Sequence, residues 1–318
     1  MKQPDFWSNK NWISFLLSPL GYLYEKIVAL RLKRNKPYHA KVPVICVGNI
    51  CVGGTGKTPI CLALADYFSN QGKKVFFLNH GYKSRLQNVV IDLERHNPKD
   101  LSDEAMIFAN KLPTIIDCNR ARGAKKAEEM NADVIIMDDG FQNPTLSKQL
   151  SFVVFDGTCG VGNGLCMPAG PLRETLKQGL KRADAVVIVG EDKTGLIEKI
   201  KALYPQLPIL HGHVETTQNL KGIKGIAFAG IGHPEKFFNM LEEKGVVLTE
   251  KIAFGDHHTY MRKDVENLIN RGQPLLTTLK DAVKIDKDLR DQLMIVDIEF
   301  ILDNPSEWDA LIAEKIKE

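Results

Sequence analysis

The strongest constraint on the fold of this sequence is a glycine-rich turn that joins an apolar strand to the start of a helix. Residues 42–58 read VPVICVGNICVGGTGKT. The β-branched run at the start is typical of a buried central strand. Backbone N–H groups of such a turn, with the positive end of the following helix dipole, bind phosphate groups. The segment therefore predicts a phosphate-binding loop, in which Lys57 reaches the β- and γ-phosphates of a nucleotide and the Thr58 hydroxyl binds Mg²⁺.

This loop departs at one position from the strict pattern G-x-x-x-x-G-K-S/T, because Cys51 stands where the first glycine is expected. A glycine-rich turn without a ligand is the alternative, but strand, turn, Gly-Lys-Thr and helix follow in the required order. Val52 stands directly before Gly53, where the deviant loop of partitioning ATPases would carry a second lysine, so that subclass is disfavoured. The expected nucleotide contacts are Cys51, Val52, Gly53, Gly54, Thr55, Gly56, Lys57 and Thr58.

The second strong motif is an apolar strand that ends in two carboxylates. Residues 133–140 read DVIIMDDG, so Asp138 and Asp139 stand at the carboxyl end of the predicted strand. Acids at a strand end beside a phosphate loop are what a nucleotide–Mg²⁺ site requires. Two adjacent carboxylates repel each other unless a cation neutralises them. We therefore expect both to help hold the metal.

Other candidates follow strand ends or open helices. The loop GYKSR places Tyr82, Lys83 and Arg85 near a nucleotide or its acceptor, unless it is an ordinary surface loop. In SDEA, Ser102 is a helix N-cap, and acids in a first turn complement the helix dipole. That alone would explain Asp103 and Glu104 without chemistry.

Two more candidates lie further along the chain. Arg173, in a long connection rich in glycine and proline, is suited to stabilise charge on a transferring phosphoryl group, or else it pairs with Glu174 or another acid. In FGDHHTY, two adjacent histidines make a zinc site improbable. A histidine such as His257, oriented beside a carboxylate, is the better chemical interpretation, with a plain turn histidine as the alternative.

The size and composition indicate a globular protein. The 318 residues allow one large domain or two ordinary ones, and 44% hydrophobic with 25% charged residues allow a full core. A net charge of +3 is too small to indicate nucleic-acid binding. The six cysteines form no C-x-x-C pair, so we expect reduced cytosolic thiols and no metal site.

The N-terminal arm, residues 12–32, is the most apolar part of the first forty residues. Its uncharged portion, residues 11–24, is shorter than the roughly 20 apolar residues that a membrane span needs. Leucines recur at helical spacing, and cations follow at Arg31, Lys33, Arg34, Lys36 and Lys41. This pattern suits an interfacial helix on an anionic leaflet, or an ordinary core-packed helix.

Strands and helices alternate along the chain, which predicts an α/β fold with a parallel sheet and right-handed crossovers. We expect a P-loop NTPase-like sheet flanked by helices, a smaller C-terminal α/β lobe and an N-terminal interfacial helix. The predicted divisions are residues 1–41, 42–215 and 216–318, with a linker near 204–215. Strands are predicted in the small lobe at 225–231, 274–278 and 295–301.

With these pieces placed, the chain resembles the tetraacyldisaccharide 4'-kinase family, the lipid A 4'-kinases. The matching blocks are VGNICVGGTGKTP, GYKSR, SDEA, DDGFQNPTL, GNGLCMPAGPLRE, AFAGIGHPEKFF, FGDHHTY and TTLKDAVKI, spread over residues 42–285. The sequence departs from the family's usual residues around His80 and at Asn143, Gly255 and Leu279, and Cys51 is itself typical of the family.

The resemblance implies an enzyme that moves the γ-phosphoryl of ATP to the 4'-hydroxyl of a tetraacyl glucosamine disaccharide 1-phosphate in lipid A biosynthesis. It implies ATP and Mg²⁺ as cofactors and a lipid as acceptor. The enzyme would be monotopic on the cytoplasmic face of the bacterial inner membrane. Neither nucleic acid nor an obligate protein partner is implied.

The resemblance also implies a role for each candidate residue. Lys57 and the loop amides hold the phosphates, while Asp103 accepts the sugar hydroxyl proton and His257 orients it or raises its basicity. Arg173 stabilises the transferring phosphoryl, and Tyr82 borders the nucleotide or acceptor. The metal ligands are Thr58, Asp138 and Asp139, with Glu104 or Glu174 assisting.

Two alternatives stay open. A P-loop GTPase or ATPase that acts on a protein partner would need the guanine-reading motif N-K-x-D if it used GTP, and the sequence contains none. A soluble small-molecule kinase would not bind liposomes and would not need residues 12–32.

Overall fold

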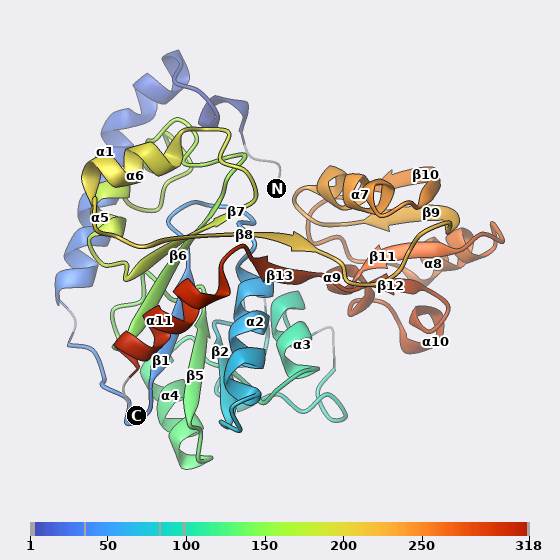
Figure 1. The fold of residues 1–318 in the computed structure, drawn as a ribbon, viewed down its shortest axis with the longest axis horizontal. Helices are drawn as coiled ribbons and strands as arrows, with labels where there is room; N and C mark the ends of the chain where they lie inside the picture. The colour runs from blue at the N-terminus through green and yellow to red at the C-terminus, as the bar shows by residue number, and fades with distance from the viewer. Residues whose placement is uncertain (1–3, 35, 83, 98–99, 317–318) are drawn as a thin grey trace.

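The computed structural model describes residues 4–34, 36–82, 84–97 and 100–316. Within these ranges the strands form two sheets, one of nine strands and one of four (Figure 1). Lys83, which the sequence places near the site, lies outside the described residues.

The nine-stranded sheet has the order β13-β8-β7-β6-β1-β5-β2-β4-β3. Its strands are β1 (Val44–Gly48), β2 (Val75–Asn79), β3 (Val89–Val90), β4 (Thr114–Ile116), β5 (Val134–Asp138), β6 (Leu150–Asp156), β7 (Ala185–Val189), β8 (Ile209–Glu215) and β13 (Glu299–Leu302). The seven strands from β8 to β4 are parallel, whereas β3 and β13 pair antiparallel at the two edges. The predicted sheet flanked by helices is confirmed, with two antiparallel edge strands added.

Helices cover both faces of this sheet. They are α2 (Lys57–Ser69), α3 (Asp103–Ala109), α4 (Arg120–Glu129), α5 (Leu176–Leu180), α6 (Leu196–Leu203) and α11 (Pro305–Lys315). Side chains of α2, α3 and α11 share one apolar core, and side chains of α4, α5 and α6 share the other. Because both faces are covered, the central strands are apolar along their whole length.

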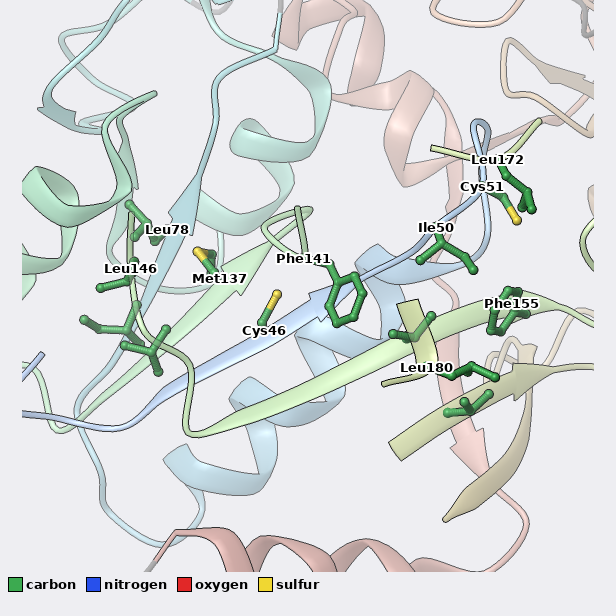
Figure 2. Packing of buried hydrophobic residues seen from close by; sticks show 14 of the residues in the cluster. Cys46, Ile50, Cys51, Leu78, Met137, Phe141, Leu146, Phe155, Leu172 and Leu180 are labelled. Carbon is green, nitrogen blue, oxygen red and sulfur yellow. The ribbon is translucent and has the colours of Figure 1, made fainter. Parts of the chain in front are cut away.

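Strand β1 is the centre of the sheet. All five of its residues are buried, and successive side chains point to opposite faces, so Cys46 joins one core and Ile45 the other. Figure 2 shows Cys46 together with Met137 and Phe141 in the core that includes side chains of α4, α5 and α6. This packing on two sides fixes where β1 ends and the glycine-rich loop begins.

The four-stranded sheet, in the order β10-β9-β11-β12, forms the smaller lobe seen on the right of Figure 1. All of its strand pairs are parallel. Its elements are β9 (Lys224–Ala229), α7 (Pro234–Glu243), β10 (Val247–Ala253), α8 (Arg262–Ile269), β11 (Leu275–Thr278), α9 (Leu279–Ala282), α10 (Lys287–Arg290) and β12 (Met294–Val296).

Two predictions about the second half of the chain were wrong. The segment 204–215 is no linker, because Ile209–Glu215 forms β8 inside the large sheet. The strand predicted at 295–301 is two strands, since β12 ends the small sheet and β13 returns to the large one. With β13 and α11 on the large sheet, a smaller lobe that begins near residue 216 ends near residue 297.

The N-terminal elements are a short turn of 3-10 helix, η1 (Asp5–Trp7), and a long helix, α1 (Trp12–Arg34). Helix α1 continues past the uncharged stretch and spans 23 residues. By length and composition it is long enough to cross a membrane. Figure 1 shows it along the outer edge of the large domain, on the side of α5 and α6.

Candidate active site

The glycine-rich loop leaves β1 and turns into α2. Gly53 and Gly56 have φ angles of 117° and 84°, which a side chain would disfavour, and Gly56 is the N-cap residue of α2. The buried side chain of Asn49 stabilises the loop, because its Nδ2 donates to Oγ1 of Thr55 over 3.2 Å. The loop N–H groups and the start of α2 therefore converge as a phosphate site requires.

A second segment braces the loop from the outside. The N–H of Val52 donates to the Pro171 carbonyl over 2.8 Å, and the N–H of Arg173 donates to the Ile50 carbonyl over 2.7 Å. Cys51 pairs with Leu172 in the same short antiparallel contact. This pairing brings Arg173 to the loop although the two are more than a hundred residues apart in sequence.

The carboxylate of Asp139 forms ion pairs with two cations. It lies 3.5 Å from Nζ of Lys57 and accepts from Nη1 of Arg173 over 2.9 Å. The Asp139 N–H donates to the carbonyl of Val47, the β1 residue level with Asp138, over 2.9 Å. Lys57, Asp139 and Arg173, predicted separately from the sequence, thus form one cluster.

Asp138 is buried beside this cluster. Nδ2 of Asn79 donates to its Oδ2 over 2.9 Å, and the buried guanidinium of Arg120 donates to its backbone carbonyl over 2.9 Å. Burial raises the pKa of Asp138 to about 7. The negative charge of Asp139 adds to this rise, and the positive charge of Lys57 opposes it. Burial alone would also raise the pKa of Asp139, but the charges of Lys57 and Arg173 outweigh burial and lower that pKa below its usual value.

Asp103 and His257 meet across the two lobes. Nδ1 of His257 lies 2.9 Å from Oδ2 of Asp103, the first residue of α3. The N-cap of that helix is Ser102, whose hydroxyl accepts from the Ala105 N–H. Burial raises the pKa of Asp103, but the hydrogen bond with His257 and the charges of Lys284 and Lys280 outweigh it, so the carboxyl stays ionised.

Glu104, another predicted metal ligand, has a carboxylate that pairs with a cation of the small lobe. It lies 3.0 Å from Nζ of Lys280 in the small lobe, and burial of its carboxyl is outweighed by that charge, which lowers its pKa. The charge of Glu104 also contributes to raising the pKa of Asp138.

The remaining predicted residues have other surroundings. Glu174 is buried and pairs with Arg182, whereas Arg173 pairs with Asp139, so the alternative of an ion pair between Arg173 and an acid holds for Asp139 and not for Glu174. Tyr82 is 64% exposed on its loop. The thiol of Cys51 is buried in the core, which raises its pKa to about 12. Contacts of Cys51, Val52 and Tyr82 with a nucleotide stay predictions.

Several residues of the site were missed by sequence reasoning, among them Gln142 and three residues of the small lobe. Gln142 donates to Asn49 O over 2.8 Å and to Glu174 over 2.9 Å, which ties the acidic strand end to the loop. Lys280 and Lys284 lie beside the carboxylates of Glu104 and Asp103 at the start of α3, and Asp281 pairs with Lys284. The signal was available in DDGFQ and in KDAVK, where the two lysines stand four residues apart just after a strand.

The donor set fits a Mg²⁺–nucleotide complex. Thr58, Asp138 and Asp139 offer oxygen atoms, which Mg²⁺ prefers. In the described part of the chain, no three His, Cys, Asp or Glu residues are gathered so as to hold a metal ion by themselves. Mg²⁺ is commonly bound through one or two carboxylates together with waters and substrate phosphates, which agrees with this arrangement.

The sheet, the loop and the acidic strand end define a P-loop nucleotide-binding protein of the α/β class. The chain belongs to the tetraacyldisaccharide-1-P 4'-kinase family, whose model matches residues 13–317. A tetraacyldisaccharide 4'-kinase of Paramagnetospirillum magneticum is 45% identical over 314 residues, which cover 96% of each chain. One of Rhodospirillum rubrum is 39% identical and covers 98% of this chain and 97% of its own.

The fold is also similar to the crystal structure of LpxK from Aquifex aeolicus in complex with ATP. The TM-score is 0.77 at 26% identity, and the match covers 96% of this chain and 99% of the other. The family resemblance seen in the sequence is therefore confirmed.

Proposed function

We propose that this protein transfers the γ-phosphoryl group of ATP to the 4'-hydroxyl of a tetraacyl glucosamine disaccharide 1-phosphate. The observation that carries the proposal is the Asp103–His257 pair, 2.9 Å apart, at the same end of the sheet as the glycine-rich loop. Family membership over nearly the whole chain supports the choice of acceptor.

The loop and its cations would bind and orient the phosphates. Loop N–H groups and the start of α2 face the phosphate chain, and Lys57 moves from Asp139 toward the β- and γ-phosphates. Thr58, Asp138 and Asp139 would hold Mg²⁺, which neutralises charge on the phosphate oxygens when bound. Glu104 would join them only by releasing Lys280.

Asp103 would accept the proton of the 4'-hydroxyl. A bond forms between the 4'-oxygen and the γ-phosphorus while the bond from that phosphorus to the bridging oxygen of ADP breaks. Phosphoryl transfer depends mainly on positioning and charge stabilisation, so an ionised Asp103 with a low pKa suffices to orient the hydroxyl and take its proton. His257 holds the carboxylate in place, and Arg173 stabilises charge on the transferring group.

Helix α1 would place the enzyme on an anionic membrane surface. Its exposed apolar residues are Trp12, Phe15, Leu16, Leu20, Tyr22, Leu23, Ile27 and Leu30. Another side of it contacts the domain, where a Cβ at Gly21 would lie 2.7 Å from the Cys166 carbonyl and Glu25 accepts from Gln178 over 2.8 Å. Because protein covers that side, a monotopic position on the membrane surface fits better than a span, and the use of ATP favours the cytoplasmic face of the inner membrane.

The test is transfer of label from ATP radiolabelled at the γ-phosphate to purified tetraacyl disaccharide 1-phosphate in detergent micelles. The wild type is expected to give a labelled lipid, and Lys57→Ala none. Asp103→Asn should lower transfer about 100-fold or more while ATP affinity changes little. Asp66→Asn, which alters an ion pair with Lys111, is the control and should match the wild type.

Two results would contradict the proposal. A wild type that binds ATP but labels no lipid would remove the acceptor and favour a protein or soluble substrate. Equal losses of transfer and of ATP affinity in Asp103→Asn would remove its role as base.

A further inference from the structure

We propose that Lys284 and Asp281 are positioning residues that hold the Asp103–His257 pair in its working geometry. Lys284 acts on the carboxylate of Asp103, and Asp281 acts on both Lys284 and the backbone that carries His257. This inference rests on the proposed role of Asp103.

Lys284 bridges two carboxylates. Its Nζ lies 2.8 Å from Oδ1 of Asp281 and 3.7 Å from Oδ2 of Asp103, and only 9% of its side chain is exposed. It also lies 5.3 Å from the centre of the Tyr260 ring. A cation this buried is stable only when paired, so its two anions fix its place.

Asp281 is fully buried and uses both of its carboxylate oxygens. Oδ1 faces Lys284, while Oδ2 accepts from the Thr278 hydroxyl over 2.8 Å and from the Gly230 N–H over 3.0 Å. A buried carboxylate is costly unless it is paired and hydrogen-bonded, and these partners meet that need. It therefore locks the end of β9 to the start of α9.

The link to His257 runs through Gly230. The N–H of Gly230 donates to Asp281, and its carbonyl accepts the His257 N–H over 3.1 Å. His257 has a φ of 58°, which a non-glycine residue adopts only when its surroundings hold it. A Cβ at Gly230 would lie 2.9 Å from Oη of Tyr260, so this position is closely packed as well. One buried acid thus supports both members of the pair.

The charged and titratable groups that face Asp103 come from several elements. They are Glu104 on its own helix, Lys280 on α9, Lys284 just after α9, and Asp256, His257 and Tyr260 in the loop after β10. Burial favours the protonated acid, and the cations oppose it. Removing Lys284 should therefore leave the buried Asp103 carboxylate with one cation fewer to hold it in place.

The experiment measures kcat and the KM for ATP at saturating Mg²⁺ and acceptor, with purified full-length protein in micelles. Lys284→Met is expected to lower kcat about tenfold or more, with the KM for ATP within about twofold. Lys284→Arg keeps the charge and should restore most of kcat. Lys251→Met, which breaks an exposed ion pair with Glu242 in the same lobe, is the matched control and should be unchanged.

If Lys284→Met fails to fold, the isosteric Asp281→Asn gives the same test through the other partner, with an expected fall in kcat of about tenfold and an unchanged KM for ATP. A folded variant of either residue with wild-type kcat would overturn the inference, while Asp103→Asn in parallel still reports on the proposed function. Asp103→Asn with full activity would overturn both. A loss of kcat in Lys284→Met that Lys284→Arg does not restore, or that comes with an equal loss of affinity for ATP, would indicate a structural role only, which also overturns it.

Discussion

At the scale of single residues, the site contains two side chains whose backbone lies in the left-handed region. Asp139 has a φ of 46° and His257 a φ of 58°. Residues other than glycine adopt such angles at a cost, and they do so mainly where function requires it. Each is held by one backbone hydrogen bond, to Val47 and to Gly230 respectively. The strain turns one carboxylate toward Lys57 and Arg173 and one imidazole toward Asp103.

The raised pKa of Asp138 predicts a pH-dependent affinity for Mg²⁺–ATP. Burial moves this pKa from its ordinary value of 3.8 to about 7. Below that pH the bound metal must displace a proton, so affinity should fall by up to about tenfold per pH unit. Above it the affinity should level off. Calorimetric titration with Mg²⁺–ATP in buffers of different ionisation enthalpy measures both the affinity and the proton released.

The matched variant is Asp138→Asn, which keeps the shape and cannot ionise. It should bind Mg²⁺–ATP weakly and without this pH dependence. The same protonation has an effect on folding: because the folded pKa is raised, this group's contribution to stability is present below its unfolded pKa and is lost as pH rises through about 7. A wild-type affinity that stays constant through neutral pH, with no proton released, would contradict the assignment of Asp138 as a buried ligand.

At the scale of elements, local sequence indicated the centre of the sheet better than its edge. Residues 204–215 contain Pro205, Pro208 and Gly212 and so look like a linker. The structure shows a different role for Gly212. A Cβ at this position would lie 2.5 Å from the Ile301 carbonyl, so a glycine is needed for β13 to approach β8. Only the tertiary pairing reveals this, because a lone glycine indicates a turn equally well.

The division of 295–301 has the same cause. The run IVDIEFI is apolar enough for one strand, yet β12 pairs with β11 and β13 pairs with β8 in the other sheet. Periodicity describes which face a residue occupies and not which sheet it joins.

The site residues also divide into those that the local sequence reveals and those that only the tertiary fold reveals. The loop and the acidic strand end are contiguous in sequence, so their pattern is readable. Lys280 and Lys284 gain their roles only because α9 lies against the start of α3, well over a hundred residues away in the chain. Arg120 and Gln142 likewise act through strand ends that the fold brings beside them.

Helix α1 gives the prediction at the scale of elements. Leu16 and Leu23 are 68% and 57% exposed, and burying one leucine side chain in an apolar phase is worth about 1.5–3 kcal/mol. The double change Leu16→Glu with Leu23→Glu should therefore reduce binding to vesicles rich in phosphatidylglycerol by about 100-fold or more. Co-sedimentation with such vesicles measures it.

The control is Leu203→Glu, which changes a leucine that is 40% exposed at the end of α6. It should bind vesicles as the wild type does. Transfer to acceptor in detergent micelles should change little in the double variant, since α1 supplies none of the proposed catalytic groups. Undiminished vesicle binding by the double variant would show that α1 is not the membrane-binding element.

At the scale of the whole molecule, ion pairs join the small lobe to the large sheet at several places in the described part of the chain, one of them between Lys244, after α7, and Glu215 of β8. On the side of α3, His257 and Lys280 reach Asp103 and Glu104. At the end of β6, Lys236 of α7 reaches Asp156. The chain itself crosses between the lobes twice, after β8 and before β13 (Figure 1). If Asp103 is the base, as proposed, its pairing with His257 of the other lobe would couple proton transfer to closure of the two lobes.

The Lys236–Asp156 pair should hold that closure from the opposite side. Nζ of Lys236 lies 2.5 Å from Oδ2 of Asp156 and 3.0 Å from Oγ1 of Thr158. Burial raises the pKa of Asp156, but the hydrogen bonds from Lys236 and Thr158 outweigh it and keep the carboxyl ionised. Half of the Lys236 side chain is exposed, so the pair is worth no more than about 1 kcal/mol. It can bias closure without fixing it.

Lys236→Met is therefore expected to lower kcat about fivefold, the factor that corresponds to about 1 kcal/mol. Because water reaches an open site, hydrolysis of ATP without acceptor should rise relative to transfer. A double-mutant cycle with Asp156→Asn measures the coupling, with Lys251→Met as the control for loss of a surface cation in the same lobe. If the two changes add independently, Lys236 and Asp156 do not act as a pair, and this contact would then not contribute to closure.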